Sequence, residues 1–177
     1  MKTCLISMLT LLIISFVACT PKTQDVAKVD IAAVVDLPTS LEKVVKTDEE
    51  WRNQLTEQEY YVIRDKGTER PNTGELLKND KAGVYTCKAC ALPLFSSATK
   101  YDSGTGWPSY YEPINKEYIE EDTDYNLGYA RTEVMCARCD GHLGHVFKDG
   151  PKPTGLRYCI NSVSLAFEQA DQAEDQP

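Results

Sequence analysis

Hydrophobic and polar positions along this chain form short patterns whose character changes near Gly83. Two stretches, 47–51 and 56–59, begin with threonine and carry glutamate three positions later, the capping-box signature of a helix start. The second leads into an apolar stretch that stops at Gly67, so we expect two short helices. From Gly83 onward, short apolar runs alternate with Gly, Pro, Asn and Asp, which is typical of antiparallel β-structure. We therefore expect a mainly β fold with small sheets, whose strands include 84–86, 92–95, 129–132, 146–147 and 158–167.

The chain begins with one lysine and then an apolar run, 5–17. About 13 apolar residues fall short of the roughly 20 that cross a bilayer, so residues 1–18 are predicted to be an export signal peptide. The small Ala18 before Cys19 resembles the lipobox of bacterial lipoproteins, although Phe16 is less usual there than leucine. We expect Cys19 to be acylated; the alternative is a general secretory signal with an incidental cysteine.

The expected organisation beyond the signal has three parts. Residues 19–46 lack a sustained period and suit a lipid-anchored tether, 47–170 form one folded domain, and 171–177 are a disordered tail. Thr20, rather than an acidic residue, follows the cysteine, which by resemblance to other lipoproteins implies the outer membrane in a two-membraned bacterium. The predicted location is therefore membrane-anchored, facing the periplasm or exterior.

The chain is acidic, with 27 Asp and Glu against 19 Lys and Arg and a net charge of −8. Binding of nucleic acid requires clustered Lys and Arg to neutralise phosphates. This composition excludes nucleic acid as the expected partner. About 120 to 130 residues remain for folding, which is enough for one domain with one core.

Four of the seven cysteines form two Cys-x-x-Cys pairs, Cys87 with Cys90 and Cys136 with Cys139. Four thiolates around Zn²⁺ make a closed tetrahedral structural site, so we predict structural zinc. Disulfide bonding is the rival interpretation, because export leads to an oxidising compartment. A second alternative takes ligands from Cys136, Cys139, His142 and His145, which would leave the first pair without a metal.

Cys159 is the one cysteine of the exported chain that neither the signal nor the paired motifs account for. Residues 157–161 alternate as a strand, so Arg157, Cys159 and Asn161 would share one face. A nearby guanidinium favours the nucleophilic thiolate, although a half-buried structural cysteine is the alternative. The only histidines, His142 and His145, can donate protons near neutral pH or be ordinary polar residues.

The stretch 103–109 carries two glycines, but no Gly-Lys-Ser/Thr follows, so a phosphate loop is not supported. Trp107 within it is either a core residue or an aromatic wall for an apolar ligand, such as a methyl group on sulfur.

Five motifs in order give the chain a close resemblance to the B-type methionine sulfoxide reductases. They are the two Cys-x-x-Cys pairs, 103–109, 141–147, Asp149-Gly150-Pro151 and 157–161, and the resemblance runs from about Trp51 to Phe167. It implies two small antiparallel sheets of β-tent type and reduction of the R epimer of methionine sulfoxide in proteins. Oxidised exported proteins would then be substrates and a thioredoxin-like protein the reductant.

The same resemblance assigns roles to the candidate residues. Cys159 would attack the sulfoxide sulfur and become a sulfenic acid, with His145 as the proton donor, assisted by His142. The residues expected to orient the polar network are Asn161, Arg157 and Asp149, and Trp107 would receive the substrate methyl group.

One departure concerns Thr105, which stands where many family members carry a resolving cysteine. The absence of a cysteine at this position puts regeneration through an internal disulfide in doubt.

Two alternatives from other functional classes remain at this point. One is a zinc-stapled β binding module without catalysis. The other is a cysteine hydrolase using Cys159 and His145, for which no hydrolase signature is present.

Overall fold

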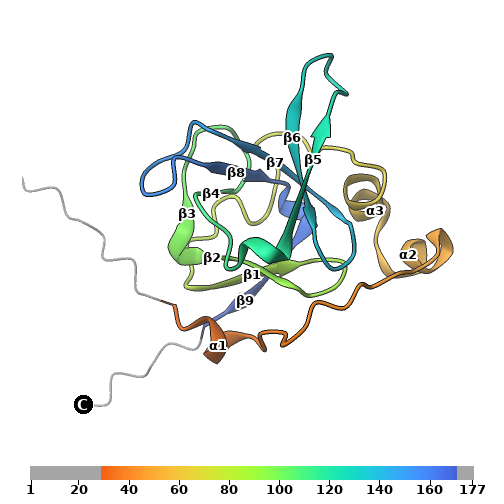
Figure 1. The fold of residues 1–177 in the computed structure, drawn as a ribbon, viewed down its shortest axis with the longest axis horizontal. Helices are drawn as coiled ribbons and strands as arrows, with labels where there is room; N and C mark the ends of the chain where they lie inside the picture. Colours follow the sequence, from red (N-terminus) through yellow and green to blue (C-terminus); the bar gives the residue numbers. More distant parts are fainter. Residues whose placement is uncertain (1–28, 171–177) are drawn as a thin grey trace, which may run out of the picture.

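A computed structural model describes residues 29–170 and has the expected mainly β architecture (Figure 1). The predicted signal peptide, Cys19 and the tail 171–177 lie outside the described residues. Within the described part, no helix is both long and apolar enough to cross a membrane. The three α-helices are α1 (Ile31–Val34), α2 (Asp48–Gln54) and α3 (Glu57–Ile63).

The two predicted helices are confirmed, including their starts. Thr47 caps α2 and Thr56 caps α3, and in each the side chain of Glu50 or Glu59 bonds back to the N-cap backbone. These reciprocal bonds satisfy N–H groups that would otherwise lack partners at a helix start. α3 ends at Ile63, four residues before Gly67, and buries one face against the core.

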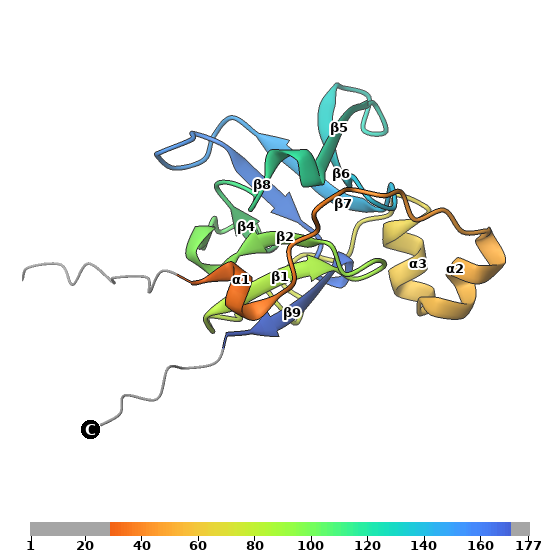
Figure 2. The same ribbon diagram turned by 60° about the horizontal axis from the view of Figure 1, so that its bottom comes forward.

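The strands form two antiparallel sheets. One has the order β2-β1-β9 and the other β3-β4-β8-β7-β6-β5, and the two are seen stacked in Figure 2. The strands are β1 (Gly83–Cys87), β2 (Pro93–Ser96), β3 (Lys100–Tyr101), β4 (Ser109–Tyr110), β5 (Ile119–Asp124), β6 (Arg131–Cys136), β7 (His142–Phe147), β8 (Arg157–Ile160) and β9 (Leu165–Gln169).

The core lies between the sheets. Strand β8 shows how alternation builds it, because Tyr158 and Ile160 are buried whereas Arg157 and Cys159 are only partly buried. Aromatic contacts fill the space between the sheets, with the Phe95 and Tyr110 rings stacked at a centroid distance of 4.4 Å. The opposite face of the six-stranded sheet therefore carries the side chains left for chemistry.

Two expectations about strands were wrong in detail. The run 158–167 is not one strand, because a 3₁₀ turn at Ser162–Ser164 ends β8 and sends β9 into the other sheet. Asn161 lies outside the strand for the same reason. Strands β3, β4 and β5 were not predicted. The sequence of β5 is acidic and typical of a solvated stretch. In the structure β5 is the exposed edge of the six-stranded sheet, where its charge prevents pairing with other chains.

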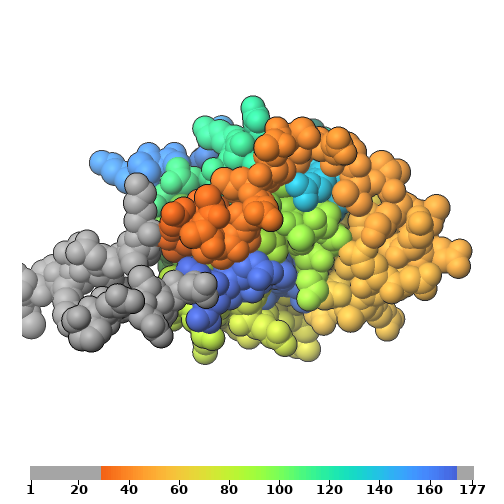
Figure 3. Space-filling view, turned by 90° about the horizontal axis from the view of Figure 1, so that it is seen from below, coloured from red at the N-terminus to blue at the C-terminus, as the bar shows by residue number. Residues whose placement is uncertain are grey.

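Part of the expected tether lies on the domain surface. Figure 3 shows this segment crossing the body of the molecule. Val44 donates its N–H to the carbonyl oxygen of Arg138 at 2.7 Å, and Lys43 pairs with Glu120 and Asp140 at 2.8 and 2.6 Å. Leu41 and Val44 also pack against the core, so the chain is held to the domain several residues before α2 begins.

Candidate active site and metal centre

Each Cys-x-x-Cys pair lies on a tight knuckle at the end of a strand. Cys87 ends β1 and Cys136 ends β6, and the residue after each second cysteine, Ala91 or Asp140, has a φ of 58°. The N–H of Ala91 donates to the Cys87 carbonyl at 2.8 Å, and that of Asp140 to the Cys136 carbonyl at 2.9 Å. The two turns therefore have matching backbone geometry and come from different sheets.

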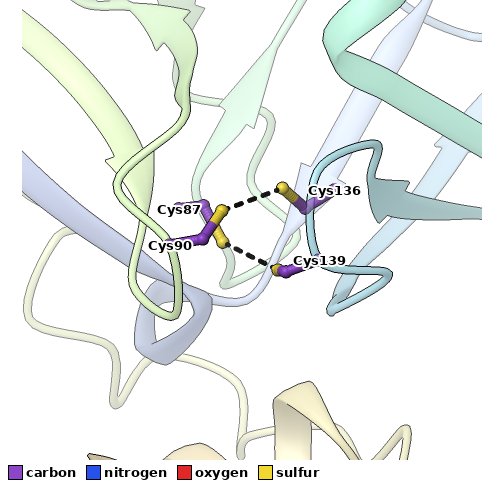
Figure 4. A group of neighbouring side chains, drawn as sticks. All are labelled: Cys87, Cys90, Cys136 and Cys139. Carbon is purple, nitrogen blue, oxygen red and sulfur yellow. Dashed lines mark hydrogen bonds between the residues drawn. The ribbon is translucent and has the colours of Figure 1, made fainter. Parts of the chain in front are cut away.

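The knuckles bring four sulfur atoms together (Figure 4). All four lie within 4.8 Å of one another, with Cys87 3.7 Å from Cys139 and Cys90 3.5 Å from Cys136. A tetrahedral zinc site with Zn–S bonds of about 2.3 Å has sulfur atoms about 3.8 Å apart, whereas a disulfide bond is about 2.05 Å long. The four cysteines therefore fit a metal ion, which would join the two sheets, and do not form disulfides.

The side chain of Cys159 lies in a row of polar residues that crosses the six-stranded sheet. In β-sheet register, Cys159 is opposite Ser109 on one side and His145 on the other. Side chains at opposed positions project from the same face, with Cβ atoms about 4.5–5.5 Å apart. The complete row is Tyr101, Ser109, Cys159, His145, Glu133 and Asp122.

Close backbone approach fixes the pairing of β7 and β8 at this row. A Cβ atom on Gly144 would lie 2.1 Å from the carbonyl oxygen of Cys159, so the two strands approach more closely than a side chain permits. Any residue other than glycine would push the strands apart at the cysteine. Gly144 therefore supports the alignment of His145 with Cys159.

Thr105 lies beside the cysteine, which agrees with the resemblance that places it where many family members carry a resolving cysteine. Its hydroxyl oxygen is 3.7 Å from the Cys159 sulfur and 2.8 Å from the hydroxyl of Ser103, which in turn contacts Ser109 at 2.7 Å. A chain of three hydroxyl groups thus ends at the thiol. Hydroxyl groups can orient polar atoms there but cannot form a disulfide.

His145 is held by a buried carboxylate. Its Nε2 is 2.8 Å from Asp124, which also pairs with Arg131. A hydrogen bond from the backbone N–H of Asn126, aided by His145 and Arg131, lowers the pKa of Asp124 to about 2. Asp124 is therefore an acceptor at neutral pH, so Nε2 of His145 carries the proton between them. Burial lowers the pKa of His145, while Asp124 opposes this shift.

His142, like His145, is held by a buried carboxylate. Its Nδ1 is 2.7 Å from Glu133, whose other oxygen accepts from Lys66 at 2.8 Å. Burial lowers the pKa of His142, and the carboxylate opposes it. A register shift between β6 and β7 lets His142 and His145, three positions apart, lie with ring centroids 5.5 Å apart. Among the described residues, the group that could hold a metal ion consists of the four cysteines and includes neither histidine, so the alternative histidine–cysteine metal site does not form.

Arg157 lies two residues from Cys159 on the same face and is committed to Asp149. The guanidinium donates two hydrogen bonds of 2.9 Å to that carboxylate and lies 4.3 Å from the ring centroid of Phe147. The ion pair lowers the pKa of Asp149. The predicted cation beside the cysteine is present, and its charge is shared with an exposed carboxylate.

Asn161 and Trp107 are linked through the backbone of Glu69. Asn161 is buried and accepts from the Glu69 N–H at 3.1 Å, while donating to the Leu143 carbonyl at 3.0 Å. The indole N–H of Trp107 donates to the Glu69 carbonyl at 3.2 Å. Trp107 is half-buried and, together with Tyr101, borders a depression of about 1020 Å³ whose lining includes neither Cys159 nor His145.

Sequence reasoning missed the carboxylates that hold the histidines, Asp124 and Glu133, and their cations, Arg131 and Lys66. Asp124 stood in a run of acidic residues that resembled a solvated turn. Alternation in β6 was the one available signal for Glu133, since it places that side chain on the face opposite to Val134.

Comparison with known proteins agrees with this geometry. A family model described as the SelR domain matches residues 55–169. A peptide methionine sulfoxide reductase MsrB of Hahella chejuensis is 57% identical over 131 residues, covering 74% of this chain and 94% of the relative. The MsrB of Leptospira interrogans is 54% identical over 72% of this chain and 97% of its own length, and that of Methanosarcina barkeri 55% identical over 74% and 92%. The chain thus belongs to the SelR-domain family that these MsrB proteins represent.

Proposed function

We propose that this protein is a peptide-methionine (R)-S-oxide reductase that returns methionine sulfoxide in proteins to methionine. The observation that carries the proposal is the register of β7 and β8, which sets a thiol directly opposite an imidazole whose protonated form is favoured by the carboxylate of Asp124. Family membership supports the same activity. A binding module without catalysis would have no need of this pairing, and the relatives are reductases by name.

The chemistry needs a nucleophile and an acid. The sulfur of Cys159 attacks the electrophilic sulfoxide sulfur while His145 supplies a proton to the oxygen, with His142 assisting. The attack forms a transient bond between the two sulfur atoms. That bond and the S–O bond of the substrate then break, the protonated oxygen moves to Cys159 as sulfenic acid, and methionine leaves. Trp107, which is half-buried, would receive the substrate methyl group.

Regeneration would use an external thiol. Thr105 cannot condense with the sulfenic acid, and the four clustered cysteines are reserved for metal. A first reductant thiol would displace water from the sulfenic acid to give a mixed disulfide, and a second would release Cys159. An exported thioredoxin-like protein with two thiols fits this requirement.

Zinc is the metal we propose for the four-cysteine site. Four thiolates in a closed tetrahedron leave no position for water, so the ion would be structural. The proposed location is an exported, lipid-anchored protein attached through Cys19, as the lipobox-like sequence suggests. Oxidised exported proteins would then be its substrates.

The proposed function is tested with separated sulfoxide epimers. With dithiothreitol as reductant, the protein should consume N-acetyl-methionine-R-sulfoxide and leave the S epimer, because one stereochemical hand places the oxygen toward His145 while the methyl group meets Trp107. Chiral chromatography of the remaining substrate measures both rates. Equal rates for the two epimers, or no turnover of either, would contradict the assignment.

A second prediction concerns Asp124→Asn. Removing this carboxylate takes away the group that favours protonated His145 and leaves the charge of Arg131, which disfavours it. The pKa of His145 should therefore fall further. Because the acid must be protonated, the pH above which kcat declines should move down by the same amount. Steady-state rates from pH 5 to 9 measure the shift.

One control variant and the pH profile together separate an effect on His145 from general damage to the fold. Glu133→Gln removes the matching carboxylate from His142, and it should leave the decline of kcat nearer to that of the parent. The other groups around His145 are Arg131, Glu133, His142 and Phe147. A lower kcat for Asp124→Asn with an unshifted pH profile would mean that Asp124 only supports the fold.

A further inference from the structure

Among the described residues, six large apolar side chains are exposed, and three of them lie within five positions of one another. These three, Tyr125, Leu127 and Tyr129, are exposed to 68%, 60% and 59% and are called the apolar tip below. They occupy the turn between β5 and β6, which projects beyond the rest of the molecule (Figure 1). Single exposed apolar residues are ordinary, but a group at a projecting turn marks an interaction site.

The turn itself does not need these side chains. The N–H of Gly128 donates to the Tyr125 carbonyl at 2.9 Å, and Gly128 has a φ of 80°, which glycine adopts without strain. The N–H of Asn126 donates to Asp124 at 2.7 Å. Backbone groups and one carboxylate close the turn, so its closure does not require the apolar side chains, of which Tyr129 also borders a hollow beside Val146 and Phe147.

The apolar tip adjoins the candidate active site. Asp124, which precedes Tyr125, contacts His145 at 2.8 Å, and His145 is opposite Cys159. Strand β5 is three strands from β8, about 14 Å across the sheet, and Tyr125 lies three residues, about 10 Å, along the chain from Asp122, which is in line with Cys159. The two steps together amount to about 17 Å, or about five residues of an extended chain. A polypeptide with one residue at Cys159 can therefore reach the apolar tip with a residue about five positions away.

We propose that the apolar tip binds apolar side chains about five residues from the methionine sulfoxide of a polypeptide substrate, an inference that rests on the proposed function. Methionine is an apolar residue that lies mostly in apolar surroundings, and its oxidation disrupts them. The segments around methionine sulfoxide are consequently rich in apolar residues that have lost their packing. Tyrosine offers such residues a broad apolar surface and keeps a polar hydroxyl in water.

The charge of the neighbouring strand and the small area of the apolar tip favour a polypeptide over a membrane surface or a second copy of the chain. The neighbouring strand exposes Glu120, Glu121 and Asp122, which would repel an anionic membrane surface. A stable interface between two copies buries about 800 Å² on each, far more than three side chains provide. The apolar tip therefore suits brief contact with a passing chain.

The test compares two substrates on a triple variant, Tyr125→Ser, Leu127→Ser and Tyr129→Ser. One substrate is N-acetyl-methionine-R-sulfoxide, and the other is a peptide that contains methionine-R-sulfoxide with leucine five residues away on each side. For the peptide, the variant should lose about tenfold in kcat/KM, equivalent to about 1.4 kcal/mol. For the small substrate, which cannot reach the turn, kcat/KM should stay as in the parent. Moving the leucines next to the methionine sulfoxide, with serine at the fifth positions, should abolish the difference.

A matched control changes the other exposed apolar residues to serine at Leu37, Val45 and Tyr61, and it should behave as the parent on both substrates. Unchanged turnover of the leucine peptide by the tip variant would overturn the inference. An equal loss on both substrates would also overturn it, since the turn would then act only through His145. Tip-dependent dimerisation in sedimentation, or tip-dependent binding to anionic vesicles, with unchanged peptide rates would assign the surface to those occupants instead. A parent without activity on either substrate would instead refute the proposed function.

Discussion

Cys159→Ser should lower turnover of methionine-R-sulfoxide by at least about 10³-fold, the largest effect expected of any single change outside the metal site. A serine hydroxyl has a far higher pKa than a thiol, so no comparable nucleophile faces the sulfoxide sulfur. The side chain is nearly isosteric and only partly buried, which leaves packing and metal content nearly unchanged. Steady-state rates, metal analysis and thermal unfolding of the same preparation measure all three.

In the parent protein, the oxidised form of Cys159 should be directly detectable. After one turnover without reductant, Cys159 should be trapped as sulfenic acid by a dimedone-type probe, because Thr105 cannot resolve it. Mass spectrometry then locates the adduct. A disulfide from Cys159 to a cysteine of the metal cluster would mean that the cluster resolves the intermediate. Rates for Cys159→Ser close to those of the parent would remove Cys159 from the chemistry altogether.

Cys136→Ser should release the metal and unfold the domain. The four sulfur atoms come from two sheets, so the ion ties together elements that are far apart in sequence. Structural zinc contributes about 10–16 kcal/mol in small zinc-binding peptides, comparable to the whole stability of a domain. Metal analysis should find one zinc ion per chain in the parent and less in the variant, with loss of near-ultraviolet circular dichroism.

Cys159→Ser serves as the matched control here, because it removes a thiol outside the cluster and should keep both the metal and the fold. Removing zinc from the parent with a strong chelator should reproduce the effect of Cys136→Ser, since both leave the knuckles without a common ion. A metal-free protein that remains folded and fully active would contradict a structural role for zinc.

Local rules in the sequence were sufficient for the helix starts and the metal knuckles. The threonine–glutamate boxes at Thr47 and Thr56 act within one turn of helix, and the Cys-x-x-Cys spacing acts within one turn of chain. Such signals do not depend on how distant segments pair. The alternation around Cys159 likewise predicted its placement beside Arg157 on one face.

The sequence did not predict which distant segments pair with one another. Asp124 and Glu133 owe their burial to the stacking of β5, β6 and β7, and nothing nearby in sequence distinguishes them from solvated carboxylates. A period of two would place His142 and His145 on opposite faces, and the register shift that brings them together has no sequence signature. Asn161, predicted on the strand face of Cys159, follows the strand and holds two backbone segments together.

The register of β7 and β8 also constrains how this chain can vary in length. Inserting or deleting one residue within either strand would turn His145 or Cys159 toward the buried side of the sheet, and the thiol and imidazole would no longer meet. The connection at 148–156 joins the strands outside the paired residues, so its length does not enter the pairing. Natural or engineered insertions should therefore be found in that connection, and the strands on either side of it should keep their length.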